Sequence, residues 1–182
     1  MYHFSAAAAP WRSLDGILQR GVWWRASTPA PLLPFLTGQL GLGEAYVRDR
    51  IETIFIDGMV VDDLDGSVVR DGSTVTLSAA MPGLVGATLR RGGYYKAMRS
   101  GISWSTLGDD GLPEEVGPGL VRVKLFNLIL REVGPRLLAH GVLVDAPLAA
   151  EALGALAAEP SAEDVDGRIL LLVDLPQAGP ED

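Results

Sequence analysis

The chain has 182 residues, of which 48% are apolar. It can therefore form one sizeable domain or two small ones with a hydrophobic core that needs no disulfide or structural metal to stabilise it. It contains no cysteine, which excludes disulfides, thiolate catalysis, iron–sulfur clusters and cysteine-ligated zinc. A formal net charge of −8 argues against broad nucleic-acid binding, because such binding depends on Lys and Arg that neutralise phosphates. No apolar run approaches the roughly 18 to 20 residues of a membrane span, and the first residues lack the basic region of a secretory signal. We therefore expect a cytoplasmic protein that contacts neither nucleic acid nor membrane.

The first fifty residues combine helical and extended patterns, punctuated by Pro and Gly. In the second predicted helix, Pro34 is tolerated because it falls in the first turn. The predicted elements are a short strand at 2–4, a helix at 11–20, a strand at 22–24, a Leu-rich helix at 32–40 and a charged connection at 46–50.

Residues 51–80 carry the strongest local signals. Two β-branched or apolar runs, at 53–56 and 74–77, are each followed by a turn that contains Gly, which predicts strand, turn and strand. The aspartates between these runs could suggest calcium, but the alternating ligands and the glutamate of an EF-hand loop are missing. We interpret them as turn residues that accept backbone hydrogen bonds, and we expect no metal site. They are Asp57, Asp62, Asp63 and Asp65.

The second half reads as strand, helix, strand, helix and strand. Residues 105–119 have the composition of a linker, and residues 120–126 alternate apolar and basic side chains, which predicts a strand with one solvated face. The elements expected after it are a helix at 128–140 that Gly134-Pro135 should kink or split, a strand at 142–144, a helix at 146–158 and a strand at 168–175. The predicted organisation is a domain at 1–104, the linker at 105–119, a small α/β segment at 120–176 and a disordered tail at 177–182.

Residues 32–83 resemble the small ubiquitin-like sulfur carriers of molybdopterin and thiamine synthesis. The Leu-rich helix LLPFLTGQLGL, the strand and turn TIFIDGMVV and the final RDGSTVTLSAAMPG follow the order of that family. The resemblance implies an α+β protein with a β-grasp (ubiquitin-like) unit and a C-terminal α/β extension. The extension either packs on this unit or completes its sheet. The segment VRVKLFNLILREVG also echoes the first strand of these carriers, which would indicate a duplicated or split β-grasp unit.

The family's activity requires a free C-terminal Gly-Gly, and this chain departs from that pattern. Met81-Pro82-Gly83 is followed by about a hundred further residues, Gly92-Gly93 is internal, and the chain ends in Pro180-Glu181-Asp182. Sulfur-carrier chemistry would therefore need prior proteolysis after Gly83 or Gly93. The resemblance carries the fold and not the activity.

One basic stretch stands out in the acidic chain and is the candidate binding site for an anion or a partner. Guanidinium groups bind carboxylate or phosphate bidentately, and tyrosines stack or donate hydrogen bonds. The alternative is a solvated turn whose cations pair with carboxylates of the same chain. The candidate residues are Arg90, Arg91, Tyr94, Tyr95, Lys96 and Arg99.

No catalytic constellation is evident, because no nucleophile–base pair and no phosphate-binding or zinc motif occurs. We therefore expect a non-catalytic binding or accessory protein of bacterial type, without a cofactor, that contacts a protein partner or associates with itself. Two alternatives stay open. One is a sulfur-carrier-like precursor, and the other is an enzyme that acts on a small anionic substrate.

Overall fold

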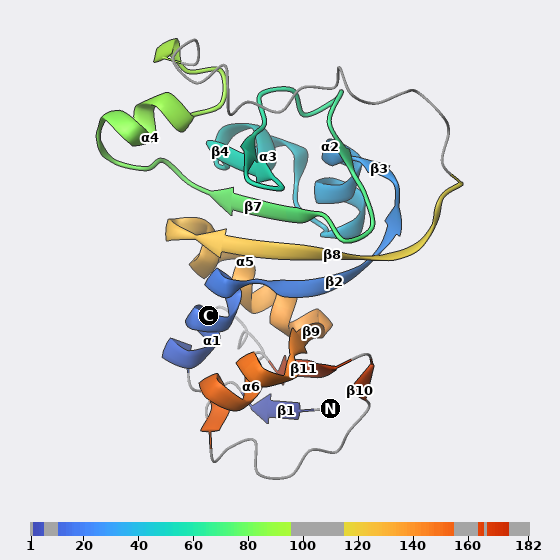
Figure 1. Ribbon diagram of the computed structural model, residues 1–182. Helices are drawn as coiled ribbons and strands as arrows, with labels where there is room; N and C mark the ends of the chain where they lie inside the picture. Colours follow the sequence, from blue (N-terminus) through green and yellow to red (C-terminus); the bar gives the residue numbers. More distant parts are fainter. Residues whose placement is uncertain (1, 6–10, 96–114, 155–163, 166, 175–182) are drawn as a thin grey trace, which may run out of the picture.

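The computed structural model describes residues 2–5, 11–95, 115–154, 164–165 and 167–174, and shows an α+β protein (Figure 1). Its strands are β1 (Tyr2–Ser5), β2 (Val22–Thr28), β3 (Ala30–Pro31), β4 (Thr53–Ile56), β5 (Met59–Val60), β6 (Val68–Val69), β7 (Thr74–Ser78), β8 (Gly117–Phe126), β9 (Val142–Asp145), β10 (Asp164–Val165) and β11 (Arg168–Asp174). Its helices are α1 (Trp11–Arg20), α2 (Leu32–Pro34), the π-helical turn η1 (Phe35–Gln39), α3 (Glu44–Asp49), α4 (Gly83–Leu89), α5 (Asn127–His140) and α6 (Ala146–Leu153).

Within the described residues, nine of the strands form one mixed sheet. Its order is β1-β11-β9-β2-β8-β7-β4-β5, with β10 paired to β11, while β3 and β6 form a separate two-stranded sheet. The pairs β1/β11 and β7/β8 are parallel and the other pairs of the large sheet are antiparallel. Figure 1 shows β2, β8 and β7 side by side through the middle of the molecule.

Strand β8 joins the two halves of the chain. It lies between β2 and β7, so the centre of the sheet combines strands from both ends of the sequence. Along its length, Val121 pairs with Trp24 of β2 and Val123 pairs with Val75 of β7. The strand begins at Gly117, inside the range expected to be a linker, and residues 105–114 of that range lie outside the described residues.

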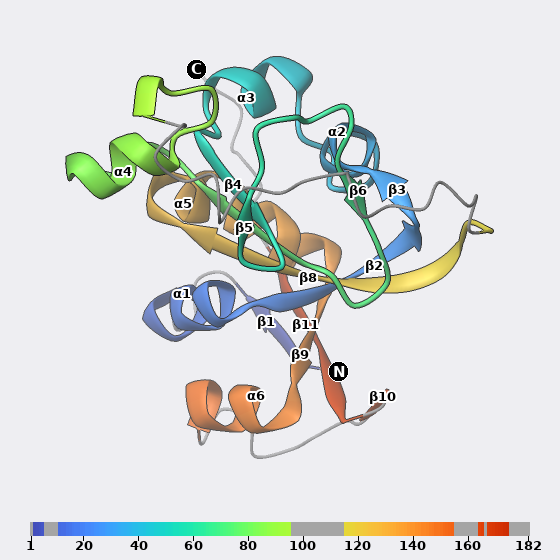
Figure 2. The same cartoon turned by 45° about the horizontal axis from the view of Figure 1, so that its top comes forward.

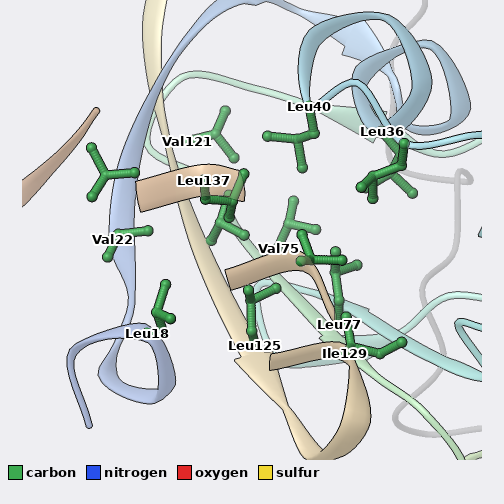
Figure 3. Close-up of a cluster of buried hydrophobic side chains, with 14 of the residues drawn as sticks. Leu18, Val22, Leu36, Leu40, Val75, Leu77, Val121, Leu125, Ile129 and Leu137 are labelled. Atoms are coloured by element: carbon green, nitrogen blue, oxygen red, sulfur yellow. The ribbon is translucent and has the colours of Figure 1, made fainter. Parts of the chain in front are cut away.

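One face of the sheet forms the core. Val121, Val123 and Leu125 of β8 have no exposed surface, and side chains from η1 and α5 pack against this face. Figure 3 shows this cluster, with Leu137 of α5 and Leu36 of η1 directed toward the strands. The alternation predicted for residues 120–126 is therefore confirmed, because the odd-numbered side chains point into the core and the even-numbered ones do not.

Helix α5 crosses this face without a break, as Figure 2 shows from a second direction. Gly134-Pro135 was expected to kink or split this helix, and the split does not occur, because α5 runs from Asn127 to His140. Gly134 lies where α5 contacts α1, and a Cβ there would come within 2.6 Å of Leu18 Cδ1. Close packing of both helices on the sheet holds α5 together although Pro135 removes one backbone donor.

Three further expectations need correction. Residues 46–50 are not a connection, because helix α3 covers Glu44–Asp49. Val47 is the single buried residue of α3, so its sequence shows no helical apolar stripe from which the helix could have been predicted. The helix expected at 32–40 is a three-residue α-helix followed by the π-helical turn, where the Leu40 N–H donates to Phe35 O at 3.0 Å. The helix expected at 146–158 ends at Leu153 in the described part of the chain.

Asp57 and Asp63 act as turn residues, as predicted. Asp63 Oδ1 accepts the backbone N–H groups of Asp65 and Gly66, both at 3.0 Å. Asp57 has a positive φ of 51° and accepts the Thr74 N–H at 2.6 Å, which ties the turn after β4 to β7. Asp62 Oδ1 instead accepts the backbone N–H of Gly92 at 2.9 Å, and Asp65 Oδ1 lies 3.6 Å from Arg48 Nη2.

Candidate ligand pocket

The face of the sheet opposite the core is partly exposed to solvent. We call it the open face. It presents Phe55 of β4, Thr76 of β7, and Lys124 and Phe126 of β8, all of which are half-buried. The strands therefore have two unlike faces, one packed by helices and one accessible to a ligand.

Helix α4 folds back over one end of the open face. The chain leaves β7, passes Met81 and Pro82, and enters α4 at Gly83, whose φ of +79° is accessible to glycine at little cost. The helix then returns close to its own entry. A Cβ at Gly86 would lie 1.9 Å from the Met81 carbonyl oxygen, so only glycine permits this approach.

A pocket of about 480 Å³ lies between α4 and the open face. This volume is within the range of about 300 to 1,000 Å³ that small-molecule sites occupy. Aromatic rings and aliphatic side chains form most of the wall. The lining residues are Phe55, Thr76, Ser78, Met81, Pro82, Val85, Gly86, Phe126 and Asn127.

The polar groups of the pocket lie where β7 and β8 end. Asn127 Nδ2 donates to Ser78 Oγ at 2.9 Å, and the Ser78 hydroxyl donates to the Ala79 carbonyl oxygen at 3.0 Å. Asn127 adopts a positive φ of 55°, which asparagine tolerates better than most residues. Its side-chain carbonyl oxygen has no partner within the described part of the chain, so it can accept a hydrogen bond from a ligand.

A second group of polar residues ties β2, β8, β9 and β11 together further along the open face. The Trp23 indole N–H donates to Asp145 Oδ1 at 2.8 Å, and Arg122 Nη2 donates to Asp145 Oδ2 at 2.9 Å. The Arg168 guanidinium lies 4.4 Å from the centre of a Trp23 ring, a cation–π distance. Arg168 Nε also lies 3.6 Å from Asp145 Oδ1, so one carboxylate serves two cations.

The basic stretch predicted from the sequence is divided by the structure. Arg90 forms an ion pair with Glu52. Arg91 donates to the Arg48 carbonyl oxygen at 2.6 Å, at the C-terminal end of α3, and burial lowers the pKa of its guanidinium below the ordinary value. These contacts attach the segment after α4 to α3 and to Glu52, the residue before β4, in line with the alternative in which the cations pair within the chain.

The tyrosines of the same stretch lie at the surface. Tyr94 is 92% exposed and Tyr95 is 40% exposed, and their rings meet edge to face with centroids 5.2 Å apart. Lys96 and Arg99 lie outside the described residues. The structure therefore brings together Arg90, Arg91, Tyr94 and Tyr95 only as neighbours in sequence, and none of them lines the pocket.

The sequence contained one signal for the pocket and missed the rest. The alternation in β8 indicated a solvated face that carries Arg122 and Lys124, which is the open face. Ser78 and Asn127 belong to no motif, and α4 was not expected in a Gly-rich segment. Their association depends on the parallel pairing of Ser78 with Phe126, which no local pattern encodes.

Among the described residues, no group of three or more His, Cys, Asp or Glu side chains is arranged to hold a metal ion. No helix in the described ranges is both long and apolar enough to cross a membrane. Comparisons of the chain with protein-family models, with curated proteins and with solved structures gave no match.

Proposed function

We propose that this chain is a non-catalytic binding protein on a ubiquitin-like β-grasp scaffold, and that it holds a small, largely apolar molecule in the pocket under α4. The observation that carries the proposal is the pocket itself, about 480 Å³ in volume, with Phe55 and Phe126 in its wall and hydrogen-bonding groups at one end. Concave apolar sites with a few convergent polar groups are typical of small-molecule binding.

The arrangement of the central strands supports the scaffold. In a β-grasp fold the first and last strands lie parallel in the middle of a mixed sheet, and a helix packs on one face. Here β7, the last strand of residues 32–83, lies parallel to β8, and side chains of η1 pack on the core face. Strand β8 lies in the segment that echoes the first carrier strand, so the pairing favours a split β-grasp unit in which that strand comes late in the chain.

The surroundings of Gly83 favour a binding protein over a sulfur carrier. In a carrier the segment after the last strand is a free tail, whereas here it supplies Met81 and Pro82 to the wall of the pocket and continues into α4. Gly93 is also held, because its N–H donates to the Arg90 carbonyl oxygen at 3.1 Å. Cleavage at either glycine would cut the chain between β7 and its neighbour β8.

The chemistry of the pocket favours binding over catalysis. Its polar side chains are the hydroxyls of Thr76 and Ser78 and the amide of Asn127. These groups donate and accept hydrogen bonds but do not titrate near neutral pH, so they orient a ligand and do not supply a general acid or base.

Binding of a neutral fluorescent probe tests this proposal. N-Phenyl-1-naphthylamine is apolar and brightens when it leaves water, so we expect saturable binding to the full chain. Thr76→Trp should abolish the binding because the indole would fill the pocket from the sheet side. Thr74→Trp is the matched control, since Thr74 lies on the same strand and face but not in the pocket wall. Equal binding by both variants, or no binding by the unmodified chain, would refute the proposal.

Association with a protein partner or with a second copy stays a prediction. Two exposed apolar side chains of α4 are available for such a contact, namely Val85, which lines the pocket and is 70% exposed, and its neighbour Leu84, which is 64% exposed. Sedimentation velocity over a range of concentrations would measure self-association directly.

A further inference from the structure

We propose that the ligand of the pocket is an amphipathic anion, whose apolar body lies against Phe55 and Phe126 and whose carboxylate, sulfonate or phosphate group is held by Lys124. This inference rests on the proposed function and adds the charge of the ligand and the residue that recognises it.

Lys124 lies at the edge of the pocket. Lys124 precedes Phe126 by two residues on β8, so the two side chains are neighbours on the open face. Lys124 also pairs in register with Thr76 of β7. Both Phe126 and Thr76 line the pocket. Adjacent strands are about 4.8 Å apart, a distance that the flexible four-carbon stem of a lysine spans. The ammonium group can therefore reach a negatively charged group at the pocket mouth.

No described residue neutralises the charge of Lys124. The side chain is half-buried, yet it makes no hydrogen bond or ion pair with any residue in the described part of the chain. Arg122 and Arg168, on the same face, both have Asp145 as their partner. A partly buried cation without a counter-charge is unfavourable, and an incoming anion removes this cost.

Gly21 brings a second positive charge close to Lys124. A Cβ at Gly21 would lie 3.1 Å from Lys124 Cγ and 2.8 Å from Arg122 Nε, so the two cationic side chains rest against the same point of the chain. Arg122 is already paired with Asp145, so Lys124 is the cation of the two that is available to an anionic ligand. Among the residues that the structure describes, no acidic side chain lines the pocket to oppose the ligand.

The experiment compares two probes that share one ring system. 8-Anilinonaphthalene-1-sulfonate carries a sulfonate, whereas N-phenyl-1-naphthylamine is its neutral counterpart. Fluorescence titration of the full chain should give a lower Kd for the sulfonate than for the neutral amine. The difference should shrink as salt increases, because exposed charge interactions are screened.

Lys124→Met tests the assigned residue, since methionine keeps an apolar stem and removes the charge. We expect the sulfonate to bind about tenfold more weakly, from the loss of one charge-assisted contact in a partly exposed site. Binding of the neutral amine should not change, which also shows that the pocket is intact. Arg25→Met is the matched control. Arg25 of β2 is exposed on the open face, like Lys124, but it pairs with Leu120 of β8 and so lies far from the pocket wall.

Each other outcome has a distinct meaning. If both probes bind equally and Lys124→Met changes neither, the inference is overturned and the proposed function stands. If Lys124→Met and Arg25→Met weaken sulfonate binding equally, the effect comes from the overall positive charge of the surface. This result would also overturn the inference. If neither probe binds the unmodified chain, the proposed function fails together with the inference.

Discussion

The two faces of β8 differ in burial along the strand. Val121, Val123 and Leu125 have no exposed surface, whereas Lys124 and Phe126 on the opposite face are half-buried. The core face is packed by helices, and the open face is covered at one end by the short helix α4. One strand thus contributes to the core with one face and to the pocket where we place the ligand with the other.

The covering layers differ in the same way. Helix α5 has fourteen residues, and six of them are buried on the core face. Helix α4 has seven residues, of which only Gly86 is buried, and it exposes Leu84 and Val85. Few buried apolar contacts mean a low local free energy of opening, so α4 is the element best suited to admit a ligand.

The largest effect should come from a truncation on the core face. Leu125→Ala removes a fully buried side chain and should lower the free energy of unfolding by about 2 to 5 kcal/mol. Lys124→Ala, one residue away on the open face, should change it by less than about 0.5 kcal/mol. Urea denaturation followed by circular dichroism measures both. Similar losses for the two variants would contradict the division of β8 into a structural and a binding face.

Gly86→Ala should act on α4 with a smaller effect. The new methyl group would collide with the Met81 carbonyl oxygen, a backbone atom that cannot rotate away, at a cost of about 1 to 3 kcal/mol. Because α4 is attached weakly, it should open locally, with faster amide hydrogen exchange in residues 83–89 and weaker probe binding. Gly38→Ala is the control, since nothing lies within 4 Å of its Cβ position. Unchanged exchange in α4 would show that Gly86 does not set its position.

The smallest effect is expected between helices α3 and α5, at Glu132. Its carboxylate accepts the Tyr46 hydroxyl at 2.7 Å and pairs with Arg50. Arg50, and then Tyr46, lower the pKa of Glu132 to about 2 by hydrogen bonding to the ionised form. The pKa of Tyr46 is raised, first by burial and then by this hydrogen bond.

A depressed carboxyl pKa stabilises the fold above the unfolded value of 4.5, and this contribution is lost as the pH falls toward 2. Glu132→Gln should therefore cost about 0.5 to 1 kcal/mol at pH 7, because the group is partly solvated, and the difference from the unmodified chain should vanish in acid. Glu151→Gln, in the more exposed pair with Arg20, should have less effect. Thermal unfolding at several pH values tests this, and a pH-independent difference would rule out the charge as its cause.

Local patterns in the sequence predicted many of the elements but few of their neighbours. The apolar spacing of residues 11–20 and the alternation of residues 120–126 each indicated the right element, because periodicity reflects which side of an element faces the core. Helices α3 and α4 were not predicted, because each buries only one residue and its sequence therefore shows no apolar stripe at helical spacing. The binding site predicted at the basic stretch was chosen because positive charges cluster there in the sequence. The pocket lies elsewhere, at the ends of the paired strands β7 and β8.

The sequence by itself determined the turns at Asp57-Gly58 and Asp63 and the apolar face of β8, since each depends on residues a few positions apart. Only the tertiary structure decided that β8 lies between β2 and β7, that α4 folds back at Gly86, and that Lys124 lies beside Thr76. Pairing between strands so distant in sequence is chosen by the packing of the whole core, and the face left open by that packing is where we place the ligand.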